Sequence, residues 1–261
     1  MELRTVRAVQ YVTALREGGS LPAIIAADDF GLYVLKFRGA GQGPLALVAE
    51  LVAGEIGRAL GLNVPELVFV EVDAALGRNE PDQEIRDLLK ASVGLNLALD
   101  YLPGSTMFDP AAGDKADPET ASMVVWFDSF VANVDRTPRN ANLLNWHREL
   151  YFIDHGAAIY YHHHWPTMIE KAESPFREVK NHILLPWARS LDDADAKARD
   201  LLTADLFAEV FEAVPDKWLL KDDDGLSADE KRRVYQDFFE RRLKASSKFV
   251  EEAKRASSQL V

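Results

Sequence analysis

The amino-acid sequence predicts an α+β protein with two lobes, a β-rich N-terminal lobe and a mainly helical C-terminal lobe. Short β-prone stretches dominate the first hundred residues, whereas later apolar residues recur mostly at helical spacing. Composition changes after Pro103-Gly104, a turn-forming pair. We therefore expect one lobe over residues 1–103 and the other over residues 104–261, with a connector near residues 97–104.

The N-terminal lobe is predicted to place several strands around one main helix. Turn-forming Gly, Asp and Pro residues separate the β-prone stretches. The expected strands cover residues 6–14, 21–26, 32–37, 64–72 and 95–102. Pro44 suits the first turn of a helix, and Gly61 supplies a natural stop after its last apolar residue, Leu60. A second, short helix is expected over residues 84–91.

In the C-terminal lobe, three features locate the expected elements. Asp117-Pro118 is a strong helix start, and the aromatic residues 126, 127 and 130 that follow are expected in the core. Residues 150–153 resemble a strand. Ser227 with Glu230 forms a capping box ahead of a single closing helix, which extends past residues 249 and 250.

Composition excludes several classes of protein. The chain has 261 residues, of which 48% are apolar and 28% charged, as in ordinary globular proteins. Its net charge of −12 disfavours broad binding to nucleic acid or to anionic membranes. It has no cysteine, no run of about 20 apolar residues and no signal-peptide pattern at its start. We therefore expect a cytoplasmic protein without a membrane or nucleic-acid partner.

Two segments near the middle of the chain predict its chemistry. The first runs from Asn133 to Asn142 and places Asp135 five residues before Asn140. The second is Asp154-His155-Gly156, which follows the strand-like residues 150–153. This order is typical of a kinase-type phosphoryl-transfer site, in which one Asp orients the acceptor hydroxyl while an Asn and a second Asp hold Mg²⁺ on ATP.

Each of these residues has a candidate role and a simpler alternative. Asp135 is the candidate general base, and Asn140 and Asp154 are the candidate magnesium ligands. Asn142 either orients the loop or assists with the metal, and Gly156 is expected to let the chain turn sharply. The alternative is that these Asn and Asp residues only satisfy backbone groups of turns.

The N-terminal lobe supplies the candidate nucleotide contacts. Lys36 lies in an apolar strand, so its ammonium needs an edge position or an anionic partner. We expect it to hold ATP phosphates and to pair with Glu50, with Glu55 as the alternative. Gly18, Gly19 and Ser20 are expected to cover the phosphates, although a plain hairpin turn has the same pattern.

Two further patterns have simpler explanations. His162-His163-His164 is read as a core or surface segment, because no zinc-type spacing supports it. The acidic run at residues 222–224 lacks the remainder of a calcium-binding loop and is read as a solvated loop.

These residues resemble the HipA-like kinases and, more distantly, the phosphoinositide kinases. The resemblance rests on the segments quoted above together with Leu60-Gly61-Leu62-Asn63-Val64-Pro65 and Tyr101-Leu102-Pro103-Gly104, and runs from about residue 6 to residue 165. It implies a bilobal kinase-like fold, ATP and Mg²⁺ as cofactors, and a hydroxyl acceptor, commonly a protein Ser or Thr. Adenine is then expected against the backbone from Leu99 to Tyr101.

Some features depart from these families. Thr137 stands where phosphoinositide kinases have His, which argues against a lipid acceptor, and His155 stands where a Phe is usual. The chain is shorter than toxin-type HipA proteins and is expected to lack their additional N-terminal subdomain, so an antitoxin partner is not carried over. The hypothesis is an ATP-dependent protein kinase. The alternatives are a small-molecule kinase, a nucleotide-binding regulatory module without turnover, and a purely structural interaction protein.

Overall fold

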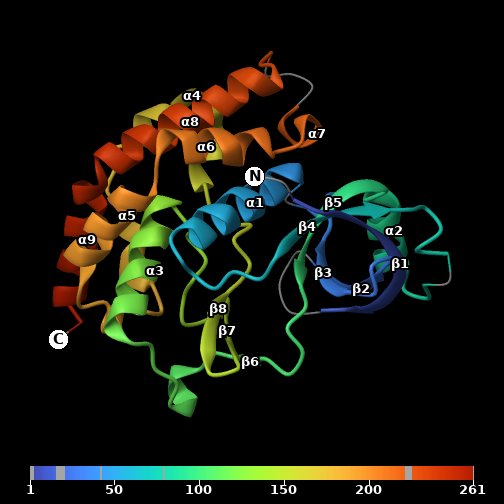
Figure 1. Ribbon diagram of the computed structural model, residues 1–261, viewed down its shortest axis with the longest axis horizontal. Helices are drawn as coiled ribbons and strands as arrows, with labels where there is room; N and C mark the ends of the chain where they lie inside the picture. The colour runs from blue at the N-terminus through green and yellow to red at the C-terminus, as the bar shows by residue number, and fades with distance from the viewer. Residues whose placement is uncertain (1–2, 16–20, 42, 79, 221–224, 261) are drawn as a thin grey trace.

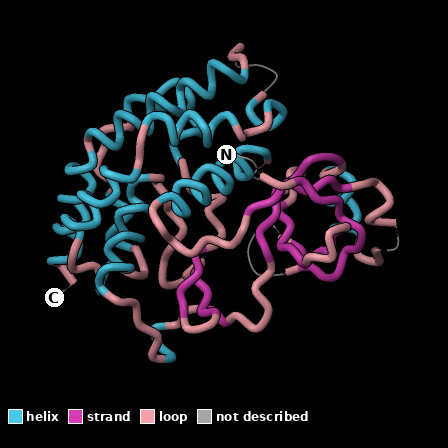
Figure 2. The backbone as a smooth tube through the Cα atoms, in the orientation of Figure 1, coloured by secondary structure: helices cyan, strands magenta, loops and turns pink. Residues whose placement is uncertain are grey.

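The computed structural model describes residues 3–260, except residues 16–20, 42, 79 and 221–224. Most strands gather in a barrel at one side of the molecule, and most helices form the other side (Figure 2). The barrel comes from the N-terminal part of the sequence and the helical layer from the C-terminal part (Figure 1). This arrangement confirms the predicted α+β class.

The barrel is built from five strands in the order β1-β2-β3-β5-β4. Its strands are β1 (Thr5–Ala14), β2 (Ala23–Ala27), β3 (Leu32–Lys36), β4 (Leu67–Val72) and β5 (Gly94–Asp100). Adjacent strands are antiparallel except β1 and β4, which are parallel. Side chains alternate along β3, so Tyr33 and Leu35 are buried in the barrel while Val34 and Lys36 line a cleft outside it.

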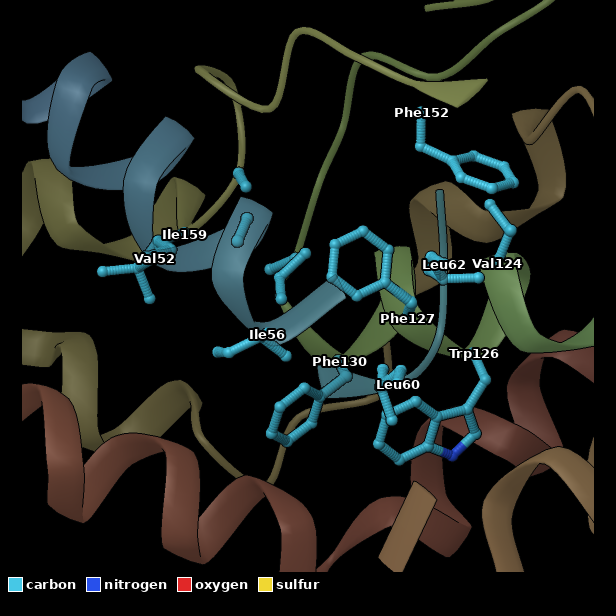
Figure 3. Close-up of a cluster of buried hydrophobic side chains, with 14 of the residues drawn as sticks. Val52, Ile56, Leu60, Leu62, Val124, Trp126, Phe127, Phe130, Phe152 and Ile159 are labelled. Atoms are coloured by element: carbon cyan, nitrogen blue, oxygen red, sulfur yellow. The ribbon is translucent and has the colours of Figure 1, made fainter. Parts of the chain in front are cut away.

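Helix α1 joins the two parts of the molecule. It spans Pro44–Ala59 and lies between the barrel and the helical layer (Figure 1). Val52 and Ile56 belong to the same hydrophobic cluster as Phe127 and Phe130 (Figure 3). A separate cluster fills the barrel, where helix α2 (Gln83–Ala91) contributes apolar side chains. The N-terminal sequence therefore supplies one helix to the core of the C-terminal part.

The helical layer packs around α3 (Pro118–Phe130), in which every residue from Ala121 onward is buried. Asp117 caps this helix by accepting a hydrogen bond from Thr120 N, as its sequence predicts. The other α-helices are α4 (Trp165–Met168), α5 (Leu191–Leu201), α6 (Ala204–Glu212), α7 (Asp216–Leu219), α8 (Ala228–Lys244) and α9 (Ser246–Ser258). Short 3₁₀ helices cover Pro110–Ala112, Tyr160–His164, Ile169–Lys171, Arg177–Asn181 and Leu185–Trp187. The capping box at the start of α8 is present, but the expected single closing helix is divided at Ala245 into α8 and α9.

A second sheet, absent from the sequence-based expectations except for its last strand, lies beneath the cleft. Its order is β6 (Thr106–Met107), β7 (Leu143–Trp146) and β8 (Glu149–Phe152). The turn between β7 and β8 uses His147 and Arg148, both with positive φ. Hairpin turns of this kind usually contain Asn or Gly, and because this turn contains neither, β7 could not be predicted from it.

The predicted connector is shorter in the structure than in the sequence analysis. Residues 97–100 belong to β5, and the amide of Tyr101 still donates to Leu32 O in the barrel. The chain leaves the barrel only after that residue, so the division at residues 103 and 104 falls between β5 and β6. Among the described residues, no helix has the length and apolar character needed to cross a membrane.

Candidate active site

A cleft of about 450 Å³ separates the barrel from the second sheet and the loops beside it. Val34, Lys36 and Leu99 line it from the barrel, and Asn140 and Asp154 line it from the opposite side. Tyr101, Leu102 and Asn142 also face this space. A larger and more open hollow, about 940 Å³, lies over β1, β4 and residues 73–80, and it contains none of the predicted site residues. The cleft is therefore the candidate site.

Lys36 ends β3 and projects into this cleft between two carboxylates. Its Nζ lies 2.5 Å from Asp154 Oδ1 and 3.8 Å from Glu50 Oε2. Burial alone would lower the pKa of Lys36, but Glu50 and Asp154 outweigh it and the pKa is raised. Glu55, the alternative partner, lies 3.7 Å from Arg58 instead. The ammonium is thus held charged at the wall of the cleft.

Glu50 projects from α1 and is only 1% exposed. Burial alone would raise the pKa of its carboxyl, yet Lys36 and then His155 outweigh burial and hold the pKa at about 2. Nδ1 of His155 lies 3.5 Å from Glu50 Oε1. A buried carboxylate on α1 is therefore kept ionised by two residues from other parts of the chain.

Two residues shape the chain after β8. Asp154 has a positive φ, and Gly156 lies in a tight turn in which the amide of Ala158 donates to His155 O. Asp154 has φ 56°, in the left-handed region that Asp tolerates better than most residues, whereas Gly156 has no positive φ. Gly156 instead lies against α1, where an added Cβ would stand 3.7 Å from Ala46 O. The expected turn at Gly156 is present, although it does not depend on a positive φ. The side chain of Asp154 remains 38% exposed toward the cleft.

The loop from Asn133 to Asn142 folds around the carboxylate of Asp135. Asn140 Nδ2 donates to Asp135 Oδ2 at 2.7 Å, and Asn142 Nδ2 lies 3.4 Å from the same oxygen. Asn133 Oδ1 accepts from the amide of Asp135 at 3.1 Å. Burial raises the pKa of Asp135, and the two Asn side chains partly offset this rise. The three predicted loop residues are thus in one hydrogen-bonded group.

A buried ion pair beneath this loop was missed by the sequence analysis. Asp128 on α3 is fully buried, and Arg136 Nε lies 2.5 Å from its Oδ2. His182 Nε2 lies 2.9 Å from the same oxygen, and Asn133 Nδ2 donates to Oδ1. Arg136 also donates to the carbonyl of Asn142, which anchors the end of the loop. The available signal was an Asp within a run of buried aromatic residues, since such a charge requires a partner.

Other predicted positions fall outside this group. Gly18, Gly19 and Ser20 lie outside the described residues. His162 is buried, with Nδ1 2.9 Å from Tyr235 Oη, which agrees with its interpretation as a core residue. Within the described ranges, no group of three or more His, Cys, Asp or Glu side chains is arranged to hold a metal ion.

Comparison with known proteins now identifies the family. The model of the HipA-like kinase family matches residues 9–250. This chain belongs to the HipA-like kinases. The match extends through the C-terminal helices, well beyond the segment ending near residue 165 on which the sequence resemblance rested. As a member of this family the protein is a kinase, that is, a phosphotransferase.

Solved structures confirm the kinase-like fold of this HipA-like kinase. The proinflammatory kinase CtkA of Helicobacter pylori is 14% identical with a TM-score of 0.52, over 97% of this chain and 99% of CtkA. A Golgi casein kinase is 11% identical with a TM-score of 0.53, over 96% of this chain and 73% of that protein. No curated protein sequence matches significantly. At such low identity the structural likeness concerns the fold alone.

Proposed function

We propose that this HipA-like kinase transfers the γ-phosphoryl group of ATP, with Mg²⁺, to a Ser or Thr hydroxyl of a protein. The observation that carries the proposal is the convergence of Lys36, Asn140 and Asp154 on one cleft, with Asp135 hydrogen-bonded to Asn140 beside it. These residues come from separate segments of the sequence, and their polar groups match the parts that phosphoryl transfer requires.

The donor atoms around the cleft suit a hard divalent cation. Asp154 offers a partly exposed carboxylate, and Asn140 directs its amide nitrogen to Asp135, which leaves its oxygen for a metal. Magnesium usually takes one or two protein carboxylates and completes its shell with phosphate oxygens and water, so no larger acidic cluster is needed. When bound, the ion neutralises phosphate charge. The similar Golgi casein kinase was solved with Mn and ADP bound, which supports nucleotide and metal binding here.

The nucleotide would lie along the barrel wall of the cleft. Lys36 is placed to hold phosphate oxygens, with Glu50 behind it as its counter-charge. Val34, Leu99 and Leu102 give the adenine an apolar surface. The amides of Asp100 and Tyr101 already donate to Glu66 O and Leu32 O. Adenine was expected against the backbone from Leu99 to Tyr101. Because two amides of this stretch are engaged, we place the donor contact at the amide of the next residue, Leu102.

Asp135 is assigned to the acceptor hydroxyl. Its carboxylate already receives the amide of Asn140, and burial raises its pKa toward that of a better base. Phosphoryl transfer depends more on orientation than on basicity, so a carboxylate that positions the hydroxyl suffices. Asn140 thereby joins the acceptor side of the site to the metal side.

The test is phosphate transfer from labelled ATP by the wild-type chain and by Asp135→Asn, with Mg²⁺ and a cell lysate as the source of acceptors. Asp135→Asn preserves size but removes the charge and the proton acceptor. We expect transfer to fall by roughly 100-fold or more while the affinity for ATP changes by less than about tenfold. Asp193→Asn, on the exposed side of α5, is the surface control and should behave as wild type.

The identity of the labelled product separates the alternatives. Labelled Ser or Thr in proteins supports the proposal, and label found only in small molecules replaces it with a small-molecule kinase. ATP binding without transfer to any acceptor would instead indicate a nucleotide-binding regulatory module. Equal transfer by wild type and Asp135→Asn would remove Asp135 from the acceptor site.

A further inference from the structure

His155 follows the candidate metal residue, and its imidazole has no part in the proposed reaction. The side chain is fully buried. Its ring meets the ring of Phe127 edge-on, with centroids 5.6 Å apart and an interplanar angle of 80°. Protein kinases carry Phe at the corresponding position after the metal-binding Asp. An apolar ring would satisfy the contact with Phe127, so packing alone gives no reason for two ring nitrogens.

The polar edge of His155 faces helix α1. Nδ1 lies 3.5 Å from Glu50 Oε1, while the other carboxylate oxygen, Oε2, lies 3.8 Å from Lys36 Nζ. Each oxygen of Glu50 therefore faces one nitrogen donor. Because Lys36 and His155 lie on either side of the carboxylate, the direction of one oxygen sets the direction of the other.

Both members of the Glu50–His155 pair need a hydrogen-bond partner. Within the described residues, neither carboxylate oxygen of Glu50 and neither ring nitrogen of His155 has one at hydrogen-bond geometry. Buried polar groups left in this state are costly. The separation of 3.5 Å is longer than an ordinary N–H···O bond of about 2.7–3.2 Å. A small movement of α1 toward the loop that carries Asp154 would let His155 Nδ1 donate to Glu50 Oε1, which satisfies both groups.

We infer that His155 is a positioning residue, whose Nδ1–H holds Oε1 of Glu50 so that Oε2 is directed at Lys36. The contact connects helix α1 to the loop that carries Asp154. His155 acts on the phosphates only through Glu50 and Lys36. The inference rests on the proposed function of this cleft. Burial alone would raise the pKa of Glu50, but Lys36 and then His155 lower it, which agrees with a donor at that oxygen.

Three substitutions at this position separate the donor from the ring. His155→Phe keeps an aromatic ring against Phe127 but removes the donor. His155→Asn keeps a donor at the same distance along the side chain as Nδ1, and His155→Gln moves the donor one atom outward. The matched control is His162→Phe, which removes another buried imidazole, one that contacts Tyr235 outside the cleft.

The kinetic readout is kcat and KM for ATP, with protein stability followed by thermal unfolding. We expect kcat to fall by on the order of tenfold or more in His155→Phe, as for loss of a hydrogen bond to a charged group. KM should change by less than about threefold, and His155→Asn should recover more activity than His155→Gln. Glu50→Gln combined with His155→Phe should be no slower than Glu50→Gln alone, because both changes break the same contact.

Two kinetic results would overturn the inference. One is a His155→Phe variant whose kcat stays within about twofold of wild type. The other is a double variant whose loss equals the product of the two single losses, which indicates independent action.

Nuclear magnetic resonance of the chain labelled with ¹⁵N-histidine tests the contact without any change at residue 155. Glu50→Gln should shift the Nδ1 resonance of His155 and leave that of His162 in place. An unchanged His155 resonance overturns the inference even in an active kinase. If Glu50→Gln shifts the His155 resonance but the wild-type chain transfers no phosphate, the contact is supported and the proposed function is contradicted. The two failures are therefore distinguishable.

Discussion

Asp128 illustrates how one buried residue organises the candidate site from below. Its carboxylate is fully buried on α3 and is surrounded by Arg136, His182 and Asn133. Arg136 uses its remaining donor capacity on the carbonyl of Asn142. The geometry of the loop around Asp135 is therefore coupled to an ion pair that no nucleotide or acceptor would touch. Loss of Arg136 leaves the buried carboxylate with only His182 and Asn133, and loss of Asp128 leaves the buried guanidinium without a carboxylate.

The first prediction concerns Arg136. Arg136→Met should destabilise the protein by about 3–5 kcal/mol, because it leaves the carboxylate of Asp128 without its main counter-charge. Arg139→Met is the matched control, since Arg139 is exposed in the same loop and should change stability by less than about 0.5 kcal/mol. Urea unfolding measures both. Equal stability of the two variants would show that the buried pair contributes little.

The second prediction concerns acid unfolding. Burial alone would raise the pKa of Asp128, but Arg136 and His182 outweigh it and the pKa lies well below its usual range. A carboxyl with a depressed folded-state pKa contributes stability that is complete above its unfolded pKa, about 3.9, and is lost as the pH falls toward the folded value. Wild type should therefore lose stability steeply below about pH 4.

Asp128→Asn should be less stable than wild type at neutral pH but should lose less of its stability between about pH 5 and pH 3. Asp193→Asn should keep the wild-type slope. The measurement is the free energy of unfolding in urea at several pH values. If the free energy of unfolding of Asp128→Asn falls with pH as steeply as that of wild type, other carboxyls dominate the loss of stability in acid.

At the scale of elements, the sequence predicted the strands and helices that have local signals. The start of α3 at Asp117-Pro118 and the capping box of α8 are confirmed. The hairpin of β7 and β8 was incompletely predicted, because its turn lacks Asn or Gly and its first strand has only four residues. Pairing order was also beyond prediction, because the parallel contact of β1 with β4 joins residues far apart in the chain.

The glycines that follow β3, at positions 39, 41 and 43, differ in how closely they are packed. Glycine-rich segments are commonly mobile connectors. Gly39 instead packs against the end of α2, where an added Cβ would lie 2.6 Å from Ala91 Cβ and 2.9 Å from its backbone carbon. Gly43 is the N-cap of α1 with φ 68°. Gly41 has no neighbour within 4 Å of such a Cβ.

The third prediction compares two of these glycines. Gly39→Ala should destabilise the protein by about 1–3 kcal/mol, because the methyl group meets backbone that cannot easily retreat. Gly41→Ala, two residues away, should change stability by less than about 0.5 kcal/mol. Urea unfolding distinguishes them. If both variants match wild type, the contact between this segment and α2 is adjustable rather than tightly packed.

At the scale of the whole molecule, the candidate site exists only because distant segments meet. The motif order predicted which residues would form one group, and the structure brings Lys36, Asp135, Asn140 and Asp154 to one region. The buried residues beneath the loop around Asp135 could not be predicted, because Arg136 and His182 contact Asp128 through tertiary contacts that carry no local pattern. The same holds for α1, which belongs to the N-terminal sequence but packs in the C-terminal core.

The last prediction follows from a ligand that contacts both walls of the cleft. ATP with Mg²⁺ binds only the folded protein, so at about 100 times its dissociation constant it should add about 2.7 kcal/mol of stability. For a chain of this size that corresponds to a rise of roughly 5–10 °C in Tm. Asp154→Ala should lose the Mg²⁺-dependent part of the rise, since it removes the proposed carboxylate ligand. Asp100→Ala, which removes another carboxylate from the same cleft, should keep that part. An equal Mg²⁺-dependent rise in wild type and Asp154→Ala would exclude Asp154 from the metal site, and the metal would then have to be held by Asp135 with the neighbouring Asn side chains.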